Sequence, residues 1–239
     1  MLTHTQAIVI SALKYGEADL IVKAYTLSDG LKTYMLKNVL KSKKGKFRAS
    51  MFQSLTRLEI IANHRGADRM EYLKDAKVAN NYMSIYTHPV KMTMAIFLAE
   101  MLKNTIREEE GNPALFNYLE YSFEFLDTTE RIANFHLVFL LNLTKYLGFQ
   151  PEQEKNDFPV FNLLEGVFQE IPINDYCIEG KNVDVLKKLL GIDFDALEHI
   201  KMNKATRNEF LNMLLLYYEL HIEGFHKPKS LSVLKEIFG

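Results

Sequence analysis

The spacing of apolar residues changes once along this chain. Up to about residue 80 they tend to recur at every second position, and from about residue 88 onward at every third or fourth position. A period of two is typical of a β-strand with one buried face, whereas a spacing of three to four lines apolar side chains along one side of an α-helix. We therefore predict an α+β fold, with a β domain at residues 1–80 and an all-α helical domain at residues 81–239.

Five segments of the first domain carry the strand pattern and are rich in β-branched and aromatic residues. They are residues 6–11, 20–25, 33–36, 55–61 and 71–78. Gly30 supplies the positive φ that a tight hairpin turn needs between the second and third strands. No proline precedes Pro89, so every predicted strand keeps its backbone donors. Five short strands favour a small closed barrel, because closure removes exposed strand edges.

The second domain carries signals for the beginnings and ends of helices. Pro89 and Pro113 each stand in the first turn of a predicted helix, where proline is tolerated. A third helix is predicted from about Thr129 to Gly148, because a glycine followed by Pro151 is a typical helix end.

An irregular insertion is predicted at residues 151–180, where prolines and glycines interrupt the helical pattern. Within this insertion, residues 160–161 could pair with residues 167–168 to form a small hairpin. Beyond it, further helices are predicted at about residues 182–190, 193–201, 204–222 and 231–238.

Charge is divided unevenly between the two predicted domains. Residues 1–80 hold 14 basic and 7 acidic residues, a net charge of +7. The whole chain has 29 basic and 30 acidic residues, which leaves 15 basic and 23 acidic residues, or −8, for residues 81–239. This asymmetry indicates a polyanionic partner for the first domain.

The strongest single feature is a segment of residues 37–48, termed the basic loop here, with six cations and no acidic residue. The six are Lys37, Lys41, Lys43, Lys44, Lys46 and Arg48. No carboxylate occurs between Gly30 and Leu58, so neighbours in sequence cannot neutralise them. Small barrels bind nucleic acid over one face and the adjoining loops, so we predict that all six bind DNA. The alternative is a solvated loop that lysine keeps soluble.

Three aromatic residues, Tyr34, Phe47 and Phe52, lie near these cations in sequence. Bases stacked on exposed rings would gain about 1–3 kcal/mol each. Aromatic residues at strand spacing more often belong to a core, so the prediction of DNA binding depends on the lysines and the arginine.

No recognisable catalytic or nucleotide-binding motif occurs in the chain, so we expect a protein that is not an enzyme. Gly45-Lys46 is followed by Phe47, and Leu40 stands where a phosphate-binding loop needs its first glycine. Neither a nucleophile elbow nor a dinucleotide-binding glycine pattern is present.

The residues that could bind metal are also unfavourably placed. His221 and His226 are five positions apart, not the four that would put two ligands on one helix face. Cys177 is the single cysteine, so neither an intrachain disulfide nor a multi-cysteine zinc site can form. We therefore expect no metal and no cofactor. The N-terminal sequence lacks a secretory pattern and the apolar runs are too short to span a bilayer, which favours a cytoplasmic location without membrane contact.

Four segments spread along the chain are specific enough to compare with a known family. The most specific is residues 16–26, Gly-Glu-Ala-Asp-Leu-Ile-Val-Lys-Ala-Tyr-Thr, which is followed by Gly30, Lys37 and the segment Phe-Gln-Ser-Leu-Thr at 52–56. The other two are Lys-Tyr-Leu-Gly-Phe-Gln-Pro at 145–151 and Lys-Ser-Leu-Ser-Val-Leu at 229–234. Together they resemble the RecO family of bacterial recombination mediators, and the last two resemble the end of that family's third helical segment and its terminal helix.

The resemblance implies an N-terminal OB-fold barrel and a C-terminal helical domain. It also implies binding to single- and double-stranded DNA, annealing of complementary strands and help in loading a recombinase in the RecF pathway. The implied partners are RecR and the C-terminal tail of the single-stranded-DNA-binding protein. Many relatives carry two Cys-x-x-Cys pairs after the Leu-Gly-Phe segment, but residues 152–180 of this chain contain only Cys177, so no zinc site is expected.

The third predicted helix offers a site for that acidic, apolar tail. Phe135, Phe139 and Leu143 are spaced four residues apart and would share one helix face, with the cations Arg131 and Lys145 towards the two ends of the helix. Interior packing is the more frequent role of such an apolar row, so Arg131 is the residue predicted to bind the partner.

Two other classes of function remain open from the sequence. The chain could be a non-enzymatic helical interaction scaffold whose basic lobe binds an acidic protein or a membrane surface. A metal-dependent nuclease is a third possibility.

Overall fold

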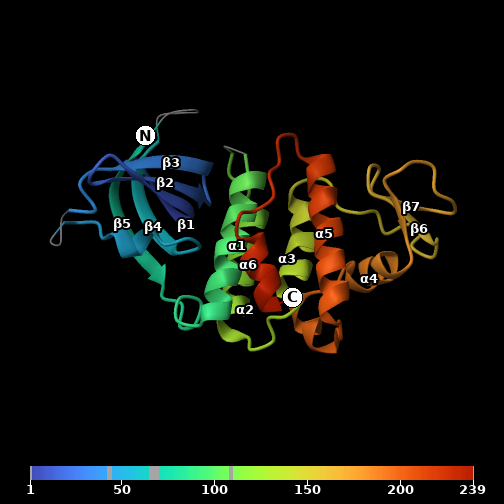
Figure 1. Ribbon diagram of the computed structural model, residues 1–239. Coiled ribbons are helices and arrows are strands. Elements are labelled where there is room, and N and C mark those ends of the chain that lie inside the picture. The colour runs from blue at the N-terminus through green and yellow to red at the C-terminus, as the bar shows by residue number, and fades with distance from the viewer. Residues whose placement is uncertain (1, 42–44, 65–69, 108–109, 239) are drawn as a thin grey trace. The chain divides into compact units, whose positions relative to one another are not determined.

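The computed structural model describes residues 2–41, 45–64, 70–107 and 110–238 (Figure 1). The chain divides into two compact units, Met1–Asp127 and Thr128–Gly239. The strands of the first unit end at Asn80, and two helices that follow belong to the same compact unit. In the described residues, no helix has both the length and the apolar composition that crossing a membrane requires.

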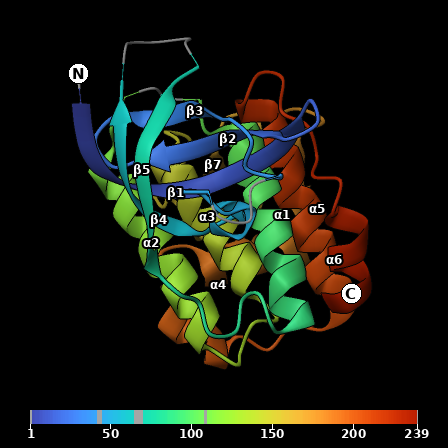
Figure 2. The same ribbon diagram turned by 90° about the vertical axis from the view of Figure 1, so that its left-hand side faces the viewer.

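Five antiparallel strands form the sheet of the first unit, in the order β3-β2-β1-β4-β5 (Figure 2). They are β1 (Leu2–Tyr15), β2 (Asp19–Thr26), β3 (Gly30–Leu36), β4 (Arg57–Asn63) and β5 (Tyr72–Asn80). All five predicted strands are confirmed, and β1 is longer at both ends than the sequence pattern predicts. Gly30 has the positive φ expected of it, 65°.

The sheet is OB-like but is not a closed barrel, which corrects the prediction of closure. Its edge strands, β3 and β5, meet at one isolated parallel bridge between Tyr34 and Glu71. There the Met35 N–H donates to the Glu71 carbonyl at 2.9 Å, and the Glu71 N–H donates to the Thr33 carbonyl at 2.8 Å. Because β3 ends at Leu36, just beyond the bridge, no strand remains to pair with the rest of β5.

Alternate residues of the strands fill the interior of the sheet, as a period of two predicts. The buried cluster also contains Val39 and Phe52 from the connection between β3 and β4. Phe52 ends the short 3₁₀ helix η1 (Ala49–Phe52). The connection that contains the basic loop is therefore fixed to the core at two points.

Helices α1 (Pro89–Thr105) and α2 (Pro113–Thr128) pack against the sheet within the first unit. The rings of Tyr25 on β2 and Phe116 on α2 are stacked with their centroids 6.4 Å apart. The Arg57 guanidinium, at the start of β4, forms ion pairs with Glu120 and Glu124, which are one turn apart on α2. These contacts join α2 to the sheet by both packing and charge.

The Asp127 carboxylate fixes the chain between the sheet and α1. It accepts hydrogen bonds from the backbone N–H groups of Met83, Ser84 and Ile85, at 2.8, 2.8 and 2.9 Å. Burial opposes ionisation of this carboxyl, but these hydrogen bonds hold the pKa of Asp127 below its usual value. The buried Lys91 ammonium donates to the Asp127 carbonyl at 2.7 Å, so α1 and α2 are tied at the same place.

The second unit consists of helices and a three-stranded sheet in the order β7-β6-β8. Its elements are α3 (Phe135–Tyr146), β6 (Val160–Asn162), β7 (Val167–Gln169), β8 (Cys177–Glu179), α4 (Lys181–Leu189), η2 (Phe194–His199), α5 (Lys204–His221) and α6 (Leu231–Phe238). The small hairpin is confirmed as β6 and β7, whereas the sequence pattern did not predict β8. The helix predicted at 193–201 is the shorter 3₁₀ helix η2.

Helix α3 begins at Phe135, six residues later than predicted. Before it, the Arg131 N–H donates to the Thr129 side-chain oxygen at 3.1 Å, a local turn that competes with helix formation. The helix is buried nearly all round, as the apolar composition of residues 137–141 requires. The Tyr218 hydroxyl of α5 donates to the Leu140 carbonyl at 2.7 Å and fixes the two helices to each other.

We expect Arg57→Ala to lower the free energy of unfolding by about 2–3 kcal/mol. This is less than the cost of breaking a fully buried ion pair, because Glu124 is half exposed. The Arg57 side chain is only 13% exposed, so its removal leaves two carboxylates next to each other without their cation. Urea unfolding followed by circular dichroism measures the effect.

Arg48→Ala is the matched control, because Arg48 is exposed and should change stability by less than about 0.5 kcal/mol. Equal stability of the Arg57 and Arg48 variants would show that the ion pairs do not join the helix to the sheet.

Candidate nucleic-acid interface

The basic loop follows β3 and is held against the turn between β1 and β2. Asn38 adopts a left-handed conformation with φ of 58°, and its N–H donates to the Asp19 carboxylate at 2.7 Å. The Leu40 N–H donates to the Ala18 carbonyl at 2.9 Å, while Val39 is buried in the core. At the other end of the loop, Phe47 packs edge-on against Phe52, with ring centroids 6.1 Å apart. The loop is therefore anchored by its apolar residues and its backbone.

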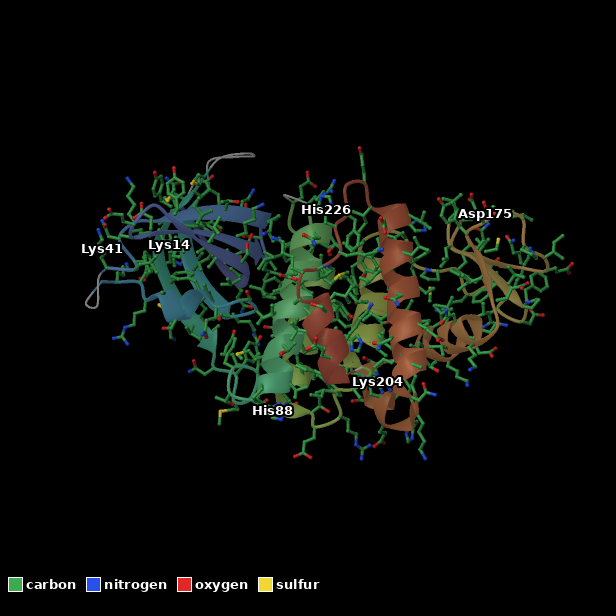
Figure 3. The ribbon with its side chains drawn as sticks, in the orientation of Figure 1. Lys14, Lys41, His88, Asp175, Lys204 and His226 are labelled. Carbon is green, nitrogen blue, oxygen red and sulfur yellow. The ribbon has the colours of Figure 1, made fainter. Side chains whose placement is uncertain are left out.

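The structure leaves the described cations of the basic loop exposed. Lys37, Lys41, Lys46 and Arg48 all have exposed side chains (Lys41 is labelled in Figure 3). The other two predicted DNA-binding residues, Lys43 and Lys44, lie outside the described residues. The loop thus presents several ammonium and guanidinium groups to solvent from one side of the OB-like sheet.

Two acidic residues that are distant in sequence approach these cations, one in the turn between β1 and β2 and one on β5. Lys41 forms an ion pair with Glu17 at 2.6 Å, and Lys46 with Asp75 at 3.3 Å. Neighbours in sequence do not neutralise the loop, but carboxylates from distant segments of the chain pair with two of its cations. All four side chains are about half exposed or more, and such surface pairs contribute only about 0–1 kcal/mol. A phosphate group could replace either carboxylate at small cost.

The aromatic residues that the sequence placed near the cations belong to the core. Tyr34 is 1% exposed and Phe52 is 2% exposed, while Phe47 is partly buried against Phe52. The Tyr34 hydroxyl hydrogen bonds to the His64 ring at 2.9 Å. Burial, together with the Asp29 and Glu71 carboxylates, raises the pKa of the Tyr34 phenol well above its usual value. These rings are not available to stack on bases.

Two other tyrosines of the same sheet, Tyr15 and Tyr72, are exposed instead. Tyr15, at the end of β1, is 53% exposed, and Tyr72, at the start of β5, is 49% exposed. The Lys37 ammonium lies 5.9 Å from the centre of the Tyr72 ring, within the range of a cation–π interaction. Sequence alternation missed Tyr15 because a β-bulge between Val9 and Ser11 shifts the register of β1.

The outer face of β1, β2 and β3 extends this surface. The strand register places Leu13 beside Ile21, and Ile21 beside Met35, in one row across the sheet. Leu13 is exposed, and the other two are partly buried. The exposed Lys23 lies beside Ser11 and Thr33 in the adjacent row. This face therefore offers apolar contacts next to cations, which suits single-stranded nucleic acid.

Metal-binding geometry is absent from the described residues, in which no group of three or more His, Cys, Asp or Glu side chains could hold an ion. The Cys177 sulfur takes part in hydrogen bonds, from the Gln169 amide at 3.3 Å and the Ile173 N–H at 3.5 Å, and to Asn174 at 3.6 Å. The His221 ring hydrogen bonds to the Leu163 carbonyl at 2.9 Å and stacks on Phe149. Both residues have structural contacts in the second unit.

The apolar row of the third predicted helix lies in the interior of the second unit, which is the role that its spacing favours. Phe135, Phe139 and Leu143 are fully buried, so they form no groove on the surface. Phe135 stacks on Phe194, with ring centroids 4.7 Å apart. Arg131 is exposed, lies in the loop before α3 and pairs with Glu198. Arg131 is accessible, but without the apolar row that the helix pattern predicted beside it.

These observations define the class of protein: an α+β protein with an exposed basic loop on an OB-like sheet, followed by a helical region. Two family models match it, Recombination protein O N terminal at residues 1–82 and Recombination protein O C terminal at residues 87–231. The chain belongs to the RecO family of DNA repair proteins.

Relatives carrying the name DNA repair protein RecO align with the whole chain and over their own full length. The protein of Christiangramia forsetii is 75% identical over 239 residues. That of Flavobacterium psychrophilum is 43% identical over 239 residues, and that of Bacteroides fragilis 35% over 244 residues. The likeness to the family therefore extends along the whole chain.

Chemical modification tests the assignment of exposed and buried rings. We expect tetranitromethane to nitrate Tyr15 and Tyr72 at least tenfold faster than Tyr34 and Tyr25. Nitration needs access and an ionisable phenol, and Tyr34 is buried with a raised pKa. Mass spectrometry of tryptic peptides reads the rates. Nitration of Tyr34 in the folded protein at the rate of Tyr72 would contradict the arrangement.

Proposed function

We propose that this protein is a recombination mediator that binds single- and double-stranded DNA, chiefly through the basic loop and the adjoining outer face of the OB-like sheet. It anneals complementary strands and helps to load a recombinase in the RecF pathway, in the cytoplasm. The observation that supports this most is the group of exposed cations Lys37, Lys41, Lys46 and Arg48 on an OB-like sheet in a RecO family member.

Lysine-rich contacts of this kind favour binding without sequence preference. Ammonium groups contact phosphates, which position a strand but carry no sequence information. The base edges stay free, so a bound strand can still pair with its complement. Tyr15 and Tyr72 would add stacking, which tolerates every base because every base has a π face. This combination is what an annealing protein requires.

We also propose that the protein acts without chemical catalysis and without a cofactor. The sequence contains no recognisable catalytic motif, which supports this interpretation. Incubation of labelled DNA with Mg²⁺ or Mn²⁺ tests it, since a metal-dependent nuclease would shorten the DNA and a mediator would leave it intact.

RecR and the tail of the single-stranded-DNA-binding protein are the partners we propose from membership of the family. For the tail, the exposed Arg131 supplies a cation that could bind an acidic peptide. The net negative charge of the helical domain does not forbid this, because that charge is screened beyond about 8 Å at physiological salt.

The second candidate function is a helical scaffold whose basic lobe binds an acidic protein or a membrane surface. The same exposed cations support it, since they would attract any polyanion. Binding of oligonucleotide at physiological salt, without binding to vesicles that contain anionic lipid, distinguishes DNA binding from this alternative.

We expect the triple variant Lys37→Gln, Lys41→Gln, Lys46→Gln to bind single-stranded oligonucleotide at least tenfold more weakly. The slope of log affinity against log salt should fall by about 0.7 for each phosphate that a lysine no longer neutralises, because fewer counterions are released. Fluorescence anisotropy at several salt concentrations gives both values.

The control variant for this test is Lys103→Gln, Lys229→Gln, which removes exposed lysines outside the basic loop. Unchanged affinity and slope in the triple variant would remove the basic loop from the DNA site. No binding by the wild type would overturn the proposed function.

For the partner tail, we expect Arg131→Glu to weaken binding of a labelled tail peptide at least fivefold while leaving oligonucleotide affinity unchanged. The physical reason is that a cation is replaced by a charge of the same sign as the peptide. Lys155→Glu is the control, because Lys155 is exposed in the same unit but lies outside the third predicted helix. Equal peptide affinity in both variants would exclude Arg131, and no peptide binding by the wild type would exclude the partner.

A further inference from the structure

A cavity of about 230 Å³ lies in the second unit, between α4 and the segment that leads into α5. Three lysines line it, Lys181, Lys188 and Lys201, together with the apolar residues Val185 and Leu189. It uses none of the residues of the basic loop.

The fold brings these lysines together for simple reasons. Lys181 and Lys188 are seven positions apart on α4, which is two helical turns, so they share one face. Val185 and Leu189 are buried and form the apolar side of the cavity. Lys201 comes from the segment between η2 and α5 (Lys204, in the first turn of α5, is labelled in Figure 3). Three lysines from two segments of the chain thus line one cavity.

The charge of this cavity is opposite to that of its surroundings. Residues 128–239 hold 12 basic and 16 acidic residues, a net charge of −4. The cavity lining has three lysines and one acidic residue, Asp184, a net charge of +2. In the described part of the chain, none of the three lysines forms an ion pair, unlike Lys41 and Lys46 of the basic loop. Gathering like charges costs free energy, and a bound anion would remove that cost.

The donors for an anion come from the lysines. The N-terminal end of α5 is already capped, because the Asn203 side chain accepts a hydrogen bond from the Thr206 N–H at 2.9 Å. The helix adds positive potential there. The lining contains no arginine, whose planar fork suits carboxylates, whereas lysine binds phosphate as a point charge. The chemistry therefore favours a phosphate group over the carboxylates of a peptide.

We propose that this cavity binds a backbone phosphate of nucleic acid and gives the chain a second DNA contact, separate from the basic loop. The proposal rests on the proposed function. Annealing needs two strands on the protein at once, and a single cationic loop that neutralises one strand leaves little attraction for another. A lysine cavity on the other unit supplies that attraction, and its apolar side accommodates the sugar next to the phosphate.

The test compares the full-length variant Lys181→Gln, Lys188→Gln, Lys201→Gln with a matched control, Lys145→Gln, Lys155→Gln, Lys229→Gln. All six lysines are exposed in the second unit, so each variant removes three charges from the surface of that unit. Three readouts are needed. They are anisotropy for one labelled oligonucleotide, capture of that oligonucleotide by protein already bound to an immobilised, non-complementary strand, and the rate of annealing of complementary strands.

We expect the cavity variant to bind a single oligonucleotide within threefold of wild type but to capture the second strand, and to anneal complements, at least tenfold less. The control variant should resemble wild type in all three. Equal capture and annealing by the two variants would overturn the second contact. Failure of the wild type to bind any oligonucleotide would instead overturn the proposed function, so the two failures are distinguishable.

Lysine acetylation provides a measurement that needs no variant. In the wild type, oligonucleotide in excess should slow acetylation of Lys181, Lys188 and Lys201 at least threefold, read by mass spectrometry, and leave Lys155 unchanged. Protection by an acidic peptide but not by oligonucleotide would assign the cavity to a peptide and contradict the proposal.

Discussion

The first unit depends on a β-bulge in its longest strand. Up to Val9, β1 places its odd-numbered residues in the core of the sheet, but the register shift between Val9 and Ser11 puts the even-numbered Ala12 opposite the core residue Val22. At the same point the Leu55 N–H donates to the Val9 carbonyl at 2.7 Å, and β1 stops pairing with β4. The bulge therefore divides β1 into a first half that pairs with β4 and, from Ala7, also with β2, and a second half that pairs with β2 alone.

The position of the candidate interface follows from that division. Because the register shift makes the odd-numbered residues of the second half of β1 face outward, Tyr15 is exposed. The turn that follows places Glu17 and Asp19 next to the basic loop. Asp19 binds the Asn38 N–H, and Glu17 pairs with Lys41. Lys41 therefore has its carboxylate partner Glu17 in the turn that follows the exposed Tyr15, although Lys41 is far from both in sequence.

Features that depend on local periodicity could be predicted from the sequence. Features that depend on strand register or on contacts between distant residues could not. The five strands, the helix beginnings at proline and the hairpin at Val160 follow from spacing and turn residues. The outward facing of Tyr15 could not be read from alternation, because one extra residue in a bulge reverses the pattern. The ion pairs of Arg57 and Lys46 involve residues from other elements, so the charges of neighbouring residues in sequence could not predict them. Helix α3 shows a different limit, since a row of apolar residues cannot distinguish a groove from a helix buried all round.

Under the proposed function, the basic loop and the lysine cavity should differ in their affinity for DNA, for an electrostatic reason. The basic loop belongs to a net positive segment, whereas the lysine cavity lies in a unit with an excess of acidic residues. Repulsion from those carboxylates acts on any strand that extends beyond the cavity, within the screening distance of about 8 Å. A strand held there is bound at one point and is released easily, while a strand on the loop makes several phosphate contacts. Annealing benefits from this asymmetry, because the duplex must leave after pairing, and a second site as strong as the first would retain it.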